Sequence, residues 1–180
     1  DISSLHLPDS SLNQDIFGLK LRLFGDLLYD QLPQVSLGVQ HRQQQNFLIP
    51  ELVGARRDED TEAYVQASRL LLGGAFGYNL LLNGGVRYSR AHQLGLLGFG
   101  GDANDQHEVL AEASLVVLFN PRWVLGVEYR QKPDNLGFAQ ENDWSDVFVG
   151  YFPNKHLALV LAWAQLGDIA GQSNQNGPYL

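Results

Sequence analysis

Residues 107–132 read HEVLAEASLVVLFNPRWVLGVEYRQK, and this stretch decides the class of fold that the sequence predicts. Apolar side chains occupy every second position from Val109 to Phe119, and the alternation resumes from Trp123 to Tyr129. Because successive side chains of a strand point to opposite faces, this period indicates two β-strands, each with one apolar face. The intervening Asn-Pro-Arg is a tight turn, so the stretch predicts an antiparallel hairpin.

The charges in this hairpin predict its register. A three-residue loop places Phe119 opposite Trp123, so that the apolar face of one strand meets the apolar face of the other. The same register brings together one opposite-charge pair and one hydrogen-bonding pair, which are Glu112 with Arg130 and Ser114 with Glu128. By the same reasoning, the turn of the last predicted hairpin sets Tyr151 near Leu157.

The alternation occurs eight times along the chain. The predicted strands are 14–24, 34–42, 62–72, 78–90, 107–119, 123–132, 143–152 and 156–166. Short connections alternate with long polar ones, so antiparallel pairing gathers the long loops at one end of the sheet. These long loops are 43–61, 91–106, 133–142 and 167–178. Most strands span about 9–12 residues, which matches the ~9–11 of a tilted transmembrane strand better than the ~5–6 of a soluble one.

These features predict an all-β fold, an antiparallel transmembrane up-and-down β-barrel with about eight strands in this chain. The length of 180 residues suits a single domain. The chain has no cysteine, which excludes a disulfide scaffold, a thiolate zinc site and a cysteine nucleophile. The net charge of −8 argues against nucleic acid as a partner, because nothing concentrates Lys or Arg.

The charged side chains of the strands occupy the less apolar phase, which in a membrane barrel faces the lumen. The lumen-lining candidates are Lys20, Arg22, Arg42, Arg87, Glu112, Glu128 and Arg130. Aromatic residues near strand ends are typical of the girdles at the two membrane interfaces. The girdle candidates are Phe119, Trp123, Tyr129, Trp144, Tyr151 and Trp163.

Other candidate chemistry has simpler interpretations. The histidines show no metal-ligand spacing, so we expect no metal site and no cofactor. Ser89 and His92 lack a nucleophile-elbow motif, and we expect no enzymatic activity. The acidic cluster of Asp58, Glu59, Asp60 and Glu62 is interpreted as part of a solvated loop. The alternative is that the cluster binds divalent cations near lipopolysaccharide. A structured loop is expected for Lys132, Asp134, Asn135, Asp143 and Trp144. The alternative for these residues is gating or ligand contact at the external mouth of the barrel.

Four segments carry a resemblance to a known family: Asp15–Asp30 (DIFGLKLRLFGDLLYD), Gly95–Asp102 (GLLGFGGD), Tyr129–Asp146 (YRQKPDNLGFAQENDWSD) and Tyr151–Leu157 (YFPNKHL). Over nearly its whole length the chain resembles an uncharacterised family of Gram-negative outer-membrane-like proteins, domain of unknown function 3034. The resemblance implies a location and a fold, and no reaction. It also implies further strands before this region and a final strand that would only begin at Gly177–Leu180. The single barrel domain 1–180 is therefore expected to lack the N-terminal strands and most of the final strand.

We therefore predict a porin-like channel for small polar solutes in the outer membrane of a Gram-negative bacterium, with the lumen charges setting selectivity. Its predicted partners are outer-membrane lipid and lipopolysaccharide, with other outer-membrane or surface proteins as further candidates. The alternative is a closed or plugged barrel with a structural or partner-binding role, favoured by the small lumen-phase residues Ala158, Val160, Ala162 and Ala164. A soluble lipid-binding barrel comes third. The outward or inward direction of Leu125, Val127, Leu159 and Leu161 discriminates between membrane and soluble barrels.

Overall fold

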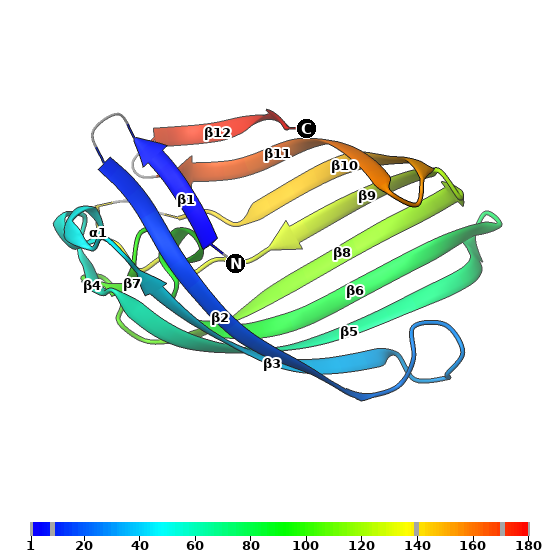
Figure 1. Cartoon of the computed structure of the whole chain (residues 1–180), viewed down its shortest axis with the longest axis horizontal. Helices are drawn as coiled ribbons and strands as arrows, with labels where there is room; N and C mark the ends of the chain where they lie inside the picture. The colour runs from blue at the N-terminus through cyan, green and yellow to red at the C-terminus, as the bar shows by residue number, and fades with distance from the viewer. Residues whose placement is uncertain (1, 8–9, 139–140, 170–171, 180) are drawn as a thin grey trace.

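The computed structural model describes residues 2–7, 10–138, 141–169 and 172–179, and the chain is an all-β protein (Figure 1). The ten long strands are β1 (Ile2–Leu7), β2 (Ser10–Phe24), β3 (Gln34–Gln44), β5 (Glu59–Ala75), β6 (Tyr78–Ser89), β8 (Glu108–Asn120), β9 (Trp123–Arg130), β10 (Trp144–Asn154), β11 (Leu157–Ile169) and β12 (Gln172–Tyr179). They form one antiparallel sheet in which spatial order follows chain order. This is the predicted up-and-down arrangement.

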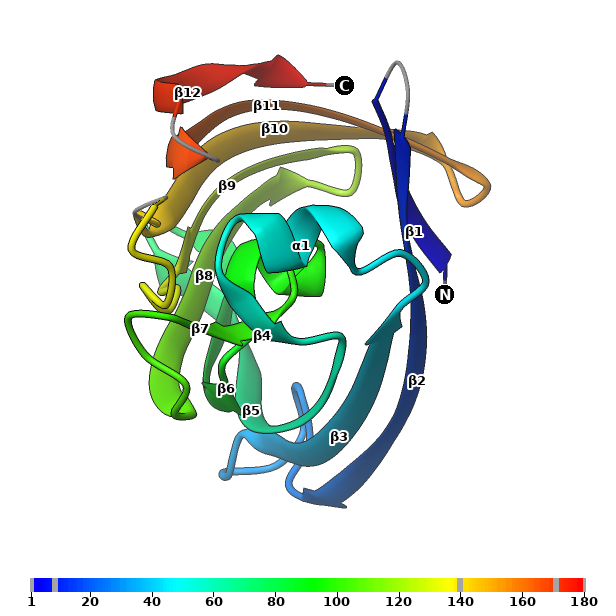
Figure 2. The ribbon, with the colours of Figure 1, turned by 90° about the vertical axis from the view of Figure 1, so that its left-hand side faces the viewer.

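The sheet curls around an interior but does not close on itself (Figure 2). Strands β1 and β12 are its two edges, and no pairing joins them among the described residues. The prediction of about eight strands was too low, because β1 and β12 extend the sheet. Residues 172–179, expected in a long loop, form β12; the sequence QSNQNGPY lacks apolar alternation, and backbone pairing with β11 holds it. Of the segment where the resemblance placed the start of a further strand, Gly177–Tyr179 forms the end of β12, and Leu180 lies outside the described residues.

The β8–β9 hairpin has the predicted register along its length but a different turn. Glu112 is the register partner of Arg130 and forms the predicted ion pair with it, and Ser114 is the register partner of Glu128. At the turn, Asn120 pairs with Trp123 across a two-residue loop, and the register shifts between Leu118 and Asn120. The predicted pairing of Phe119 with Trp123 is therefore wrong, because Phe119 occupies a bulge that absorbs the extra residue.

The β10–β11 hairpin is shifted by two residues from the predicted register. Tyr151 pairs with Leu159 and Asn154 pairs with Leu157, with an irregularity between the two pairs. Because side chains alternate with a period of two, this shift leaves every residue on its predicted face.

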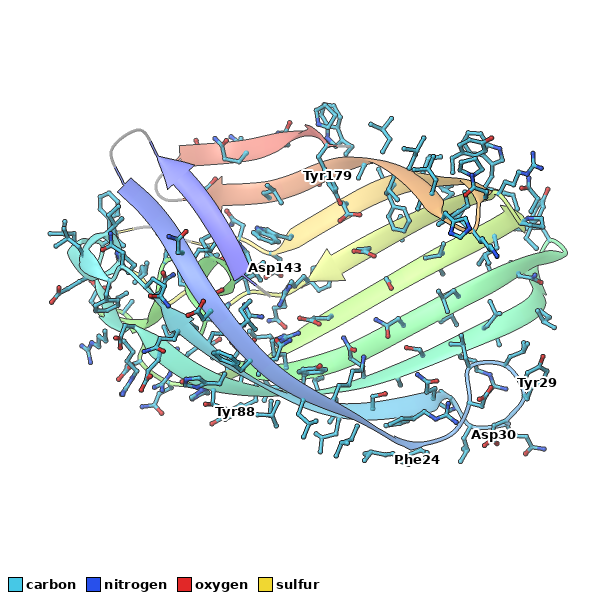
Figure 3. All side chains as sticks on the ribbon, in the orientation of Figure 1. Phe24, Tyr29, Asp30, Tyr88, Asp143 and Tyr179 are labelled. Atoms are coloured by element: carbon cyan, nitrogen blue, oxygen red, sulfur yellow. The ribbon has the colours of Figure 1, made fainter. Side chains whose placement is uncertain are left out.

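The apolar phase of the strands faces outward. Eleven of its large side chains are 37–67% exposed, namely Phe17, Leu19, Leu21, Val39, Val86, Val109, Leu125, Val127, Val149, Leu159 and Leu161. Figure 3 shows Tyr88 projecting from the same outer side. The four residues chosen to discriminate between barrel types are in this group, so the outer surface of the sheet, and not its interior, is apolar.

On the inner side, aromatic rings lie directly against strand glycines. A Cβ added to Gly38 would lie 2.2 Å from Cζ of Tyr64, and one added to Gly126 would lie 2.3 Å from Cζ of Phe148. Any larger residue at either position would displace the ring. The glycines thus allow the inner surface to pack although few aliphatic side chains point into it.

Three long connections fold together at one end of the sheet. We call them the plug: 45–58, with α1 (Leu48–Leu52) and β4 (Ala55–Arg57); 90–107, with η1 (His92–Gly95) and β7 (Phe99–Gly101); and the described part of 131–143. Strand β4 pairs with β7. Figure 2 shows α1 inside the ring drawn by the strands. In the part of the chain that the structure describes, no helix is long and apolar enough to cross a membrane.

Most of the buried apolar side chains among the described residues belong to the plug: Ala55, Ala91, Leu97, Phe99 and Leu136, compared with Leu110, Ala162 and Ala164 in the sheet. Its packing explains the GLLGFGGD segment. Gly98 and Gly100 have positive φ angles of 82° and 59°, and a Cβ on Gly98 would lie 2.7 Å from that of Ala55. Only glycine adopts such a backbone at low cost.

Candidate functional site in the interior of the sheet

Five charged side chains from five neighbouring strands form a continuous ladder of ion pairs across the inner face. Glu62 of β5 lies 2.7 Å from Nε of Arg42 on β3 and accepts a 3.0 Å hydrogen bond from Arg87 on β6. Glu112 of β8 accepts a 2.9 Å hydrogen bond from Nε of Arg87 and lies 3.1 Å from Arg130 of β9. The signs alternate from strand to strand, so each carboxylate is shared by two guanidinium groups. We call these five residues the ladder.

Burial makes this pairing necessary. Arg42, Glu62 and Arg87 are all buried, and an isolated charge at such depth would be strongly unfavourable. The sequence placed Arg42, Arg87, Glu112 and Arg130 on the inner phase, as found. It missed Glu62, because it grouped this first residue of the predicted strand with the acidic residues of the preceding loop, whereas β5 already begins at Glu59.

The acidic residues that were predicted to form a cluster on a long loop instead pair with different basic side chains. Asp60 is buried and binds Arg90 at 2.7 Å and Nε2 of His107 at 2.9 Å, while Glu59 lies 3.8 Å from Nε2 of His41. Among the residues that the structure describes, no group of three or more His, Asp or Glu side chains could hold a metal ion.

The two remaining basic candidates, Lys20 and Arg22, lie on the inner phase of β2 but outside the ladder. Lys20 donates a 3.0 Å hydrogen bond to Oε1 of Gln66, and Arg22 lies 3.7 Å from Asp26. Both remain exposed.

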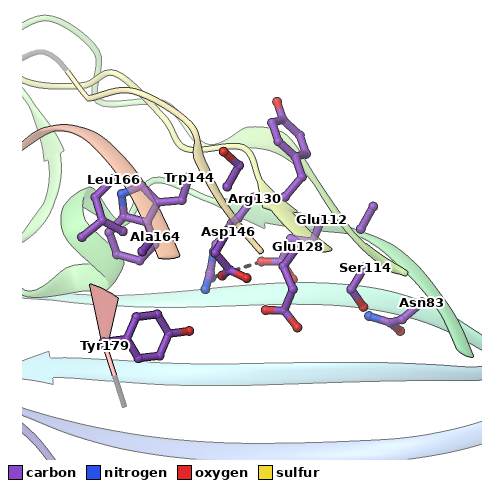
Figure 4. A pocket seen from close by; sticks show the side chains of 13 residues that line it. Asn83, Glu112, Ser114, Glu128, Arg130, Trp144, Asp146, Ala164, Leu166 and Tyr179 are labelled. Carbon is purple, nitrogen blue, oxygen red and sulfur yellow. Dashed lines mark ion pairs between the residues drawn. The ribbon is translucent and has the colours of Figure 1, made fainter. Parts of the chain in front are cut away.

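A chamber of about 600 Å³ adjoins the Arg130 end of the ladder (Figure 4). Glu128 and Asp146 line it and are register partners in the β9–β10 pairing. Neither forms an ion pair with a described residue, and Oδ1 of Asp146 is buried without a hydrogen-bond partner. Trp144 and Tyr179 complete the wall. Two adjacent unpaired carboxylates make this chamber attractive to cations and unfavourable for anions.

A second buried charge cluster lies inside the plug. Glu141 lies 2.8 Å from Nδ1 of His92, accepts hydrogen bonds at 3.1 Å on both oxygens from the backbone N–H of Gln93, and contacts Nζ of Lys132. Burial lowers the pKa of Lys132, and the Glu141 carboxylate opposes that shift. We call these four residues the Glu141 cluster. The sequence did not reveal it, because its loops are about forty positions apart.

A scan with family models matches the whole chain, residues 1–180, to the family described as "Protein of unknown function (DUF3034)". The chain belongs to the DUF3034 family. This confirms the family resemblance inferred from the sequence. Searches of curated proteins and of solved structures found no significant match.

The predicted girdle residues of this DUF3034 protein divide into two groups. Phe119, Trp123, Tyr129 and Trp163 are exposed on the outer face, and Tyr151 stacks on Trp123 with ring centroids 4.5 Å apart. Trp144 differs, because it lies on the inner phase of β10, where Nζ of Lys132 lies 3.9 Å from its ring centroid. Its placement in an outer girdle was therefore wrong; it joins the sheet to the plug instead.

The plug of the DUF3034 chain closes the interior at its end. Arg42 contacts the carbonyl of Leu94, and Gln44 contacts that of Gly95. The space left between the ladder and the plug, lined by Arg42, Glu62, Arg87, Leu94 and Lys132 among others, is about 10 Å³. A water molecule needs about 10–15 Å³ on a comparable measure, so this gap has room for one water molecule at most.

The remaining loop candidates take structural roles in the plug. Asn135 is buried and donates to the carbonyl of Arg90 at 2.9 Å. Asp134 accepts a hydrogen bond from the N–H of Glu141, and Asp143 accepts one from the N–H of Lys132. Ser89 accepts a hydrogen bond from the N–H of Ala91. These contacts explain the fold of the loop segments and bring no nucleophile and base together.

Proposed function

We propose that this DUF3034 protein is an outer-membrane β-barrel whose interior is plugged in the state seen here. In this proposal the outer face contacts lipid and lipopolysaccharide, the ladder stiffens the interior, and the plug blocks passage. The observation that carries it is the reversal of polarity across the sheet, with aliphatic side chains exposed outside and paired charges buried inside.

The exposed apolar face is too extensive for an ordinary soluble surface. Monomeric soluble proteins rarely expose contiguous apolar patches larger than a few hundred Å². Here exposed aliphatic or aromatic side chains occur on the outer phase of each of the eight long strands from β2 to β11, while the cationic ladder residues point away from them. In a bilayer this arrangement is favourable, because lipid solvates the apolar face and ion pairs satisfy the interior.

Strand length and loop arrangement support the same proposal. Seven of the eight long strands from β2 to β11 have 11–17 residues, which is enough for the ~9–11 needed to span a bilayer. Tight turns lie at the end opposite the plug, as in outer-membrane barrels. Since open sheet edges are not tolerated in lipid, the proposal requires the edges at β1 and β12 to be paired when the protein spans a membrane.

A channel for small polar solutes is the second candidate. The water-accessible chamber beside Glu128 and Asp146 favours it, because a polar cavity inside a lipid-facing sheet is the architecture of a pore. The closed gap beneath the plug favours the plugged state over the open one.

The three tryptophans provide the test. Trp123 and Trp163 lie on the outer face, whereas Trp144 lies on the inner phase of the sheet. We would reconstitute two variants in liposomes that contain brominated lipid: Trp144→Phe, which keeps the outer pair, and Trp123→Phe/Trp163→Phe, which keeps only Trp144. Brominated lipid is expected to quench the first strongly and the second weakly.

The control is the same pair of variants in liposomes without bromine. Failure of the folded protein to insert, or equal quenching of Trp144 and the outer pair, would contradict the proposal. Conductance of the wild-type protein in planar bilayers decides between the two states: no channels are expected from a plugged barrel, and steady channels would favour the second candidate.

A further inference from the structure

The Glu141 cluster joins two loops that reach the plug from different parts of the sheet. Glu141 and Lys132 belong to the connection between β9 and β10, whereas His92 and Gln93 belong to the connection between β6 and β8. The carboxylate contacts a side chain and a backbone N–H of the second loop at 2.8 and 3.1 Å, respectively. This side chain therefore adds a buried contact to the hydrogen bonds that Asn135 makes between the same two loops.

Both side-chain partners depend on this carboxylate. The side chains of His92 and Glu141 are completely buried, and that of Lys132 is 2% exposed. Glu141 is the only carboxylate that forms an ion pair with Lys132 among the described residues. Loss of its charge would leave the buried ammonium group of Lys132 without a carboxylate partner and with only a 3.4 Å hydrogen bond to Oε1 of Gln93, which is strongly unfavourable.

The loop held by Glu141 is in a strained backbone conformation. Gln93 and Leu94 have φ angles of 47° and 59°, in the left-handed region that residues with a Cβ rarely adopt. The Gln93 N–H is the group that donates to Glu141. Such strain persists only while surrounding contacts enforce it, so release of Glu141 favours movement of this segment.

The same strained segment forms the contact between the plug and the ladder. The Leu94 carbonyl accepts from Arg42, and the adjacent Gly95 carbonyl accepts from Gln44. Movement of residues 93–95 would therefore break the contacts that close the gap above Arg42. Gln93, which contacts Glu141, and Leu94, which contacts Arg42 of the ladder, are adjacent in the chain. A movement at Glu141 is therefore transmitted directly to the ladder contact.

We infer that the Glu141 cluster is the gate of the barrel: its carboxylate holds the strained segment 93–95 against the ladder, and loss of that charge opens the interior to small polar solutes. This inference rests on the proposed membrane function. It assigns the control of passage to a buried ion cluster in the plug rather than to the charges of the ladder.

The test compares Glu141→Gln with Glu51→Gln, a matched control that removes an exposed carboxylate from α1 of the same plug. Each protein is reconstituted in liposomes loaded with a small fluorescent dye. Glu141→Gln is expected to release dye at least tenfold faster than the wild type, and Glu51→Gln at the wild-type rate. The inference would be overturned if liposomes with folded, inserted Glu141→Gln released dye at the same rate as liposomes with folded, inserted wild-type protein.

Hydrogen exchange of the detergent-solubilised protein tests the plug independently of the membrane. In Glu141→Gln, the amides of Leu97, Gly98 and Gly100, which donate to plug carbonyls in the wild type, are expected to exchange at least tenfold faster. Amides of β8 and β9 should keep their wild-type protection. Unchanged plug amides would overturn the inference even if the protein failed to insert, whereas failed insertion alone contradicts the proposed function.

A double variant separates gating from general damage. Lys132→Met/Glu141→Gln removes both charges, so no buried ammonium group is left unpaired. Dye release is expected to be slower than in Glu141→Gln alone. If the single variant does not fold, the double variant is compared with wild type by exchange. Protection of its plug amides equal to wild type would then show that the carboxylate is dispensable and would overturn the inference.

Discussion

Replacing Glu62 by Gln should destabilise the folded protein more than any other single change in the ladder. Glu62 is in contact with two guanidinium groups, at 2.7 Å from Arg42 and 3.0 Å from Arg87, and its side chain is 3% exposed. At an effective dielectric constant of about 20, each contact represents roughly 5 kcal/mol of attraction, most of which offsets desolvation. Removing one member of a buried ion pair costs about 3–5 kcal/mol net. Since Arg87 keeps Glu112, the loss falls mainly on Arg42.

The assay is urea unfolding of protein reconstituted in liposomes, followed by tryptophan fluorescence. Glu59→Gln is the matched control, because it removes a carboxylate from the same strand whose side chain is 57% exposed and 3.8 Å from its histidine partner. Its expected effect is below about 1 kcal/mol. A loss below about 1 kcal/mol for Glu62→Gln would refute the reasoning, since it would mean that water reaches the ladder and solvates the guanidinium groups.

Three further predictions follow from the outer face, the chamber and the plug. Leu161→Arg places a charge on the lipid-facing side and should cost up to about 2–4 kcal/mol of unfolding free energy in liposomes; no loss would argue against lipid contact there. Asp146→Asn removes a like-charge neighbour of Glu128 and should raise the unfolding free energy by about 0.2–1 kcal/mol, so a decrease would mean that a cation normally bridges the pair. The hydrogen-bonded guanidinium of Arg57 lowers the pKa of Asp105 below its ordinary 3.8, so the stabilisation is present above that pH and is lost as the pH falls through the lowered value. The protection factors of the plug amides, corrected for the intrinsic exchange rate at each pH, should therefore fall below about pH 4 in the wild type, and Asp105→Asn should remove this pH dependence.

Much of the sheet was predictable because its signal is local. The alternation at β8 and β9 is visible over a dozen residues, and the opposite charges of Glu112 and Arg130 set the register between them. The turn was not predictable to the residue, because the bulge at Phe119 depends on how the two-residue loop closes. Strand β12 was missed for a different reason: backbone pairing with β11 requires no apolar pattern.

The candidate site was predictable only in part. Phase alone placed Arg87 and Glu112 on the inner face, but it could not distinguish Lys20, which remains exposed, from the buried ladder residues. Trp144 shows that a position near a strand end does not by itself place a side chain on the outer face. Its position near a strand end suggested an interfacial girdle, and its phase, which points inward towards Lys132, was the better signal.

The sequence by itself determined the all-β class, the arrangement of the eight central strands in the sheet in the order of the chain, and the opposite polarity of their two faces. It did so because a strand's side-chain period of two is a local property that can be counted along the chain. Only the tertiary structure decided that three loops fold into a plug and that Glu141 reaches His92 and Lys132 within it. Those contacts depend on how the loops lie relative to one another in the folded sheet, and the local side-chain period of a strand does not predict that arrangement.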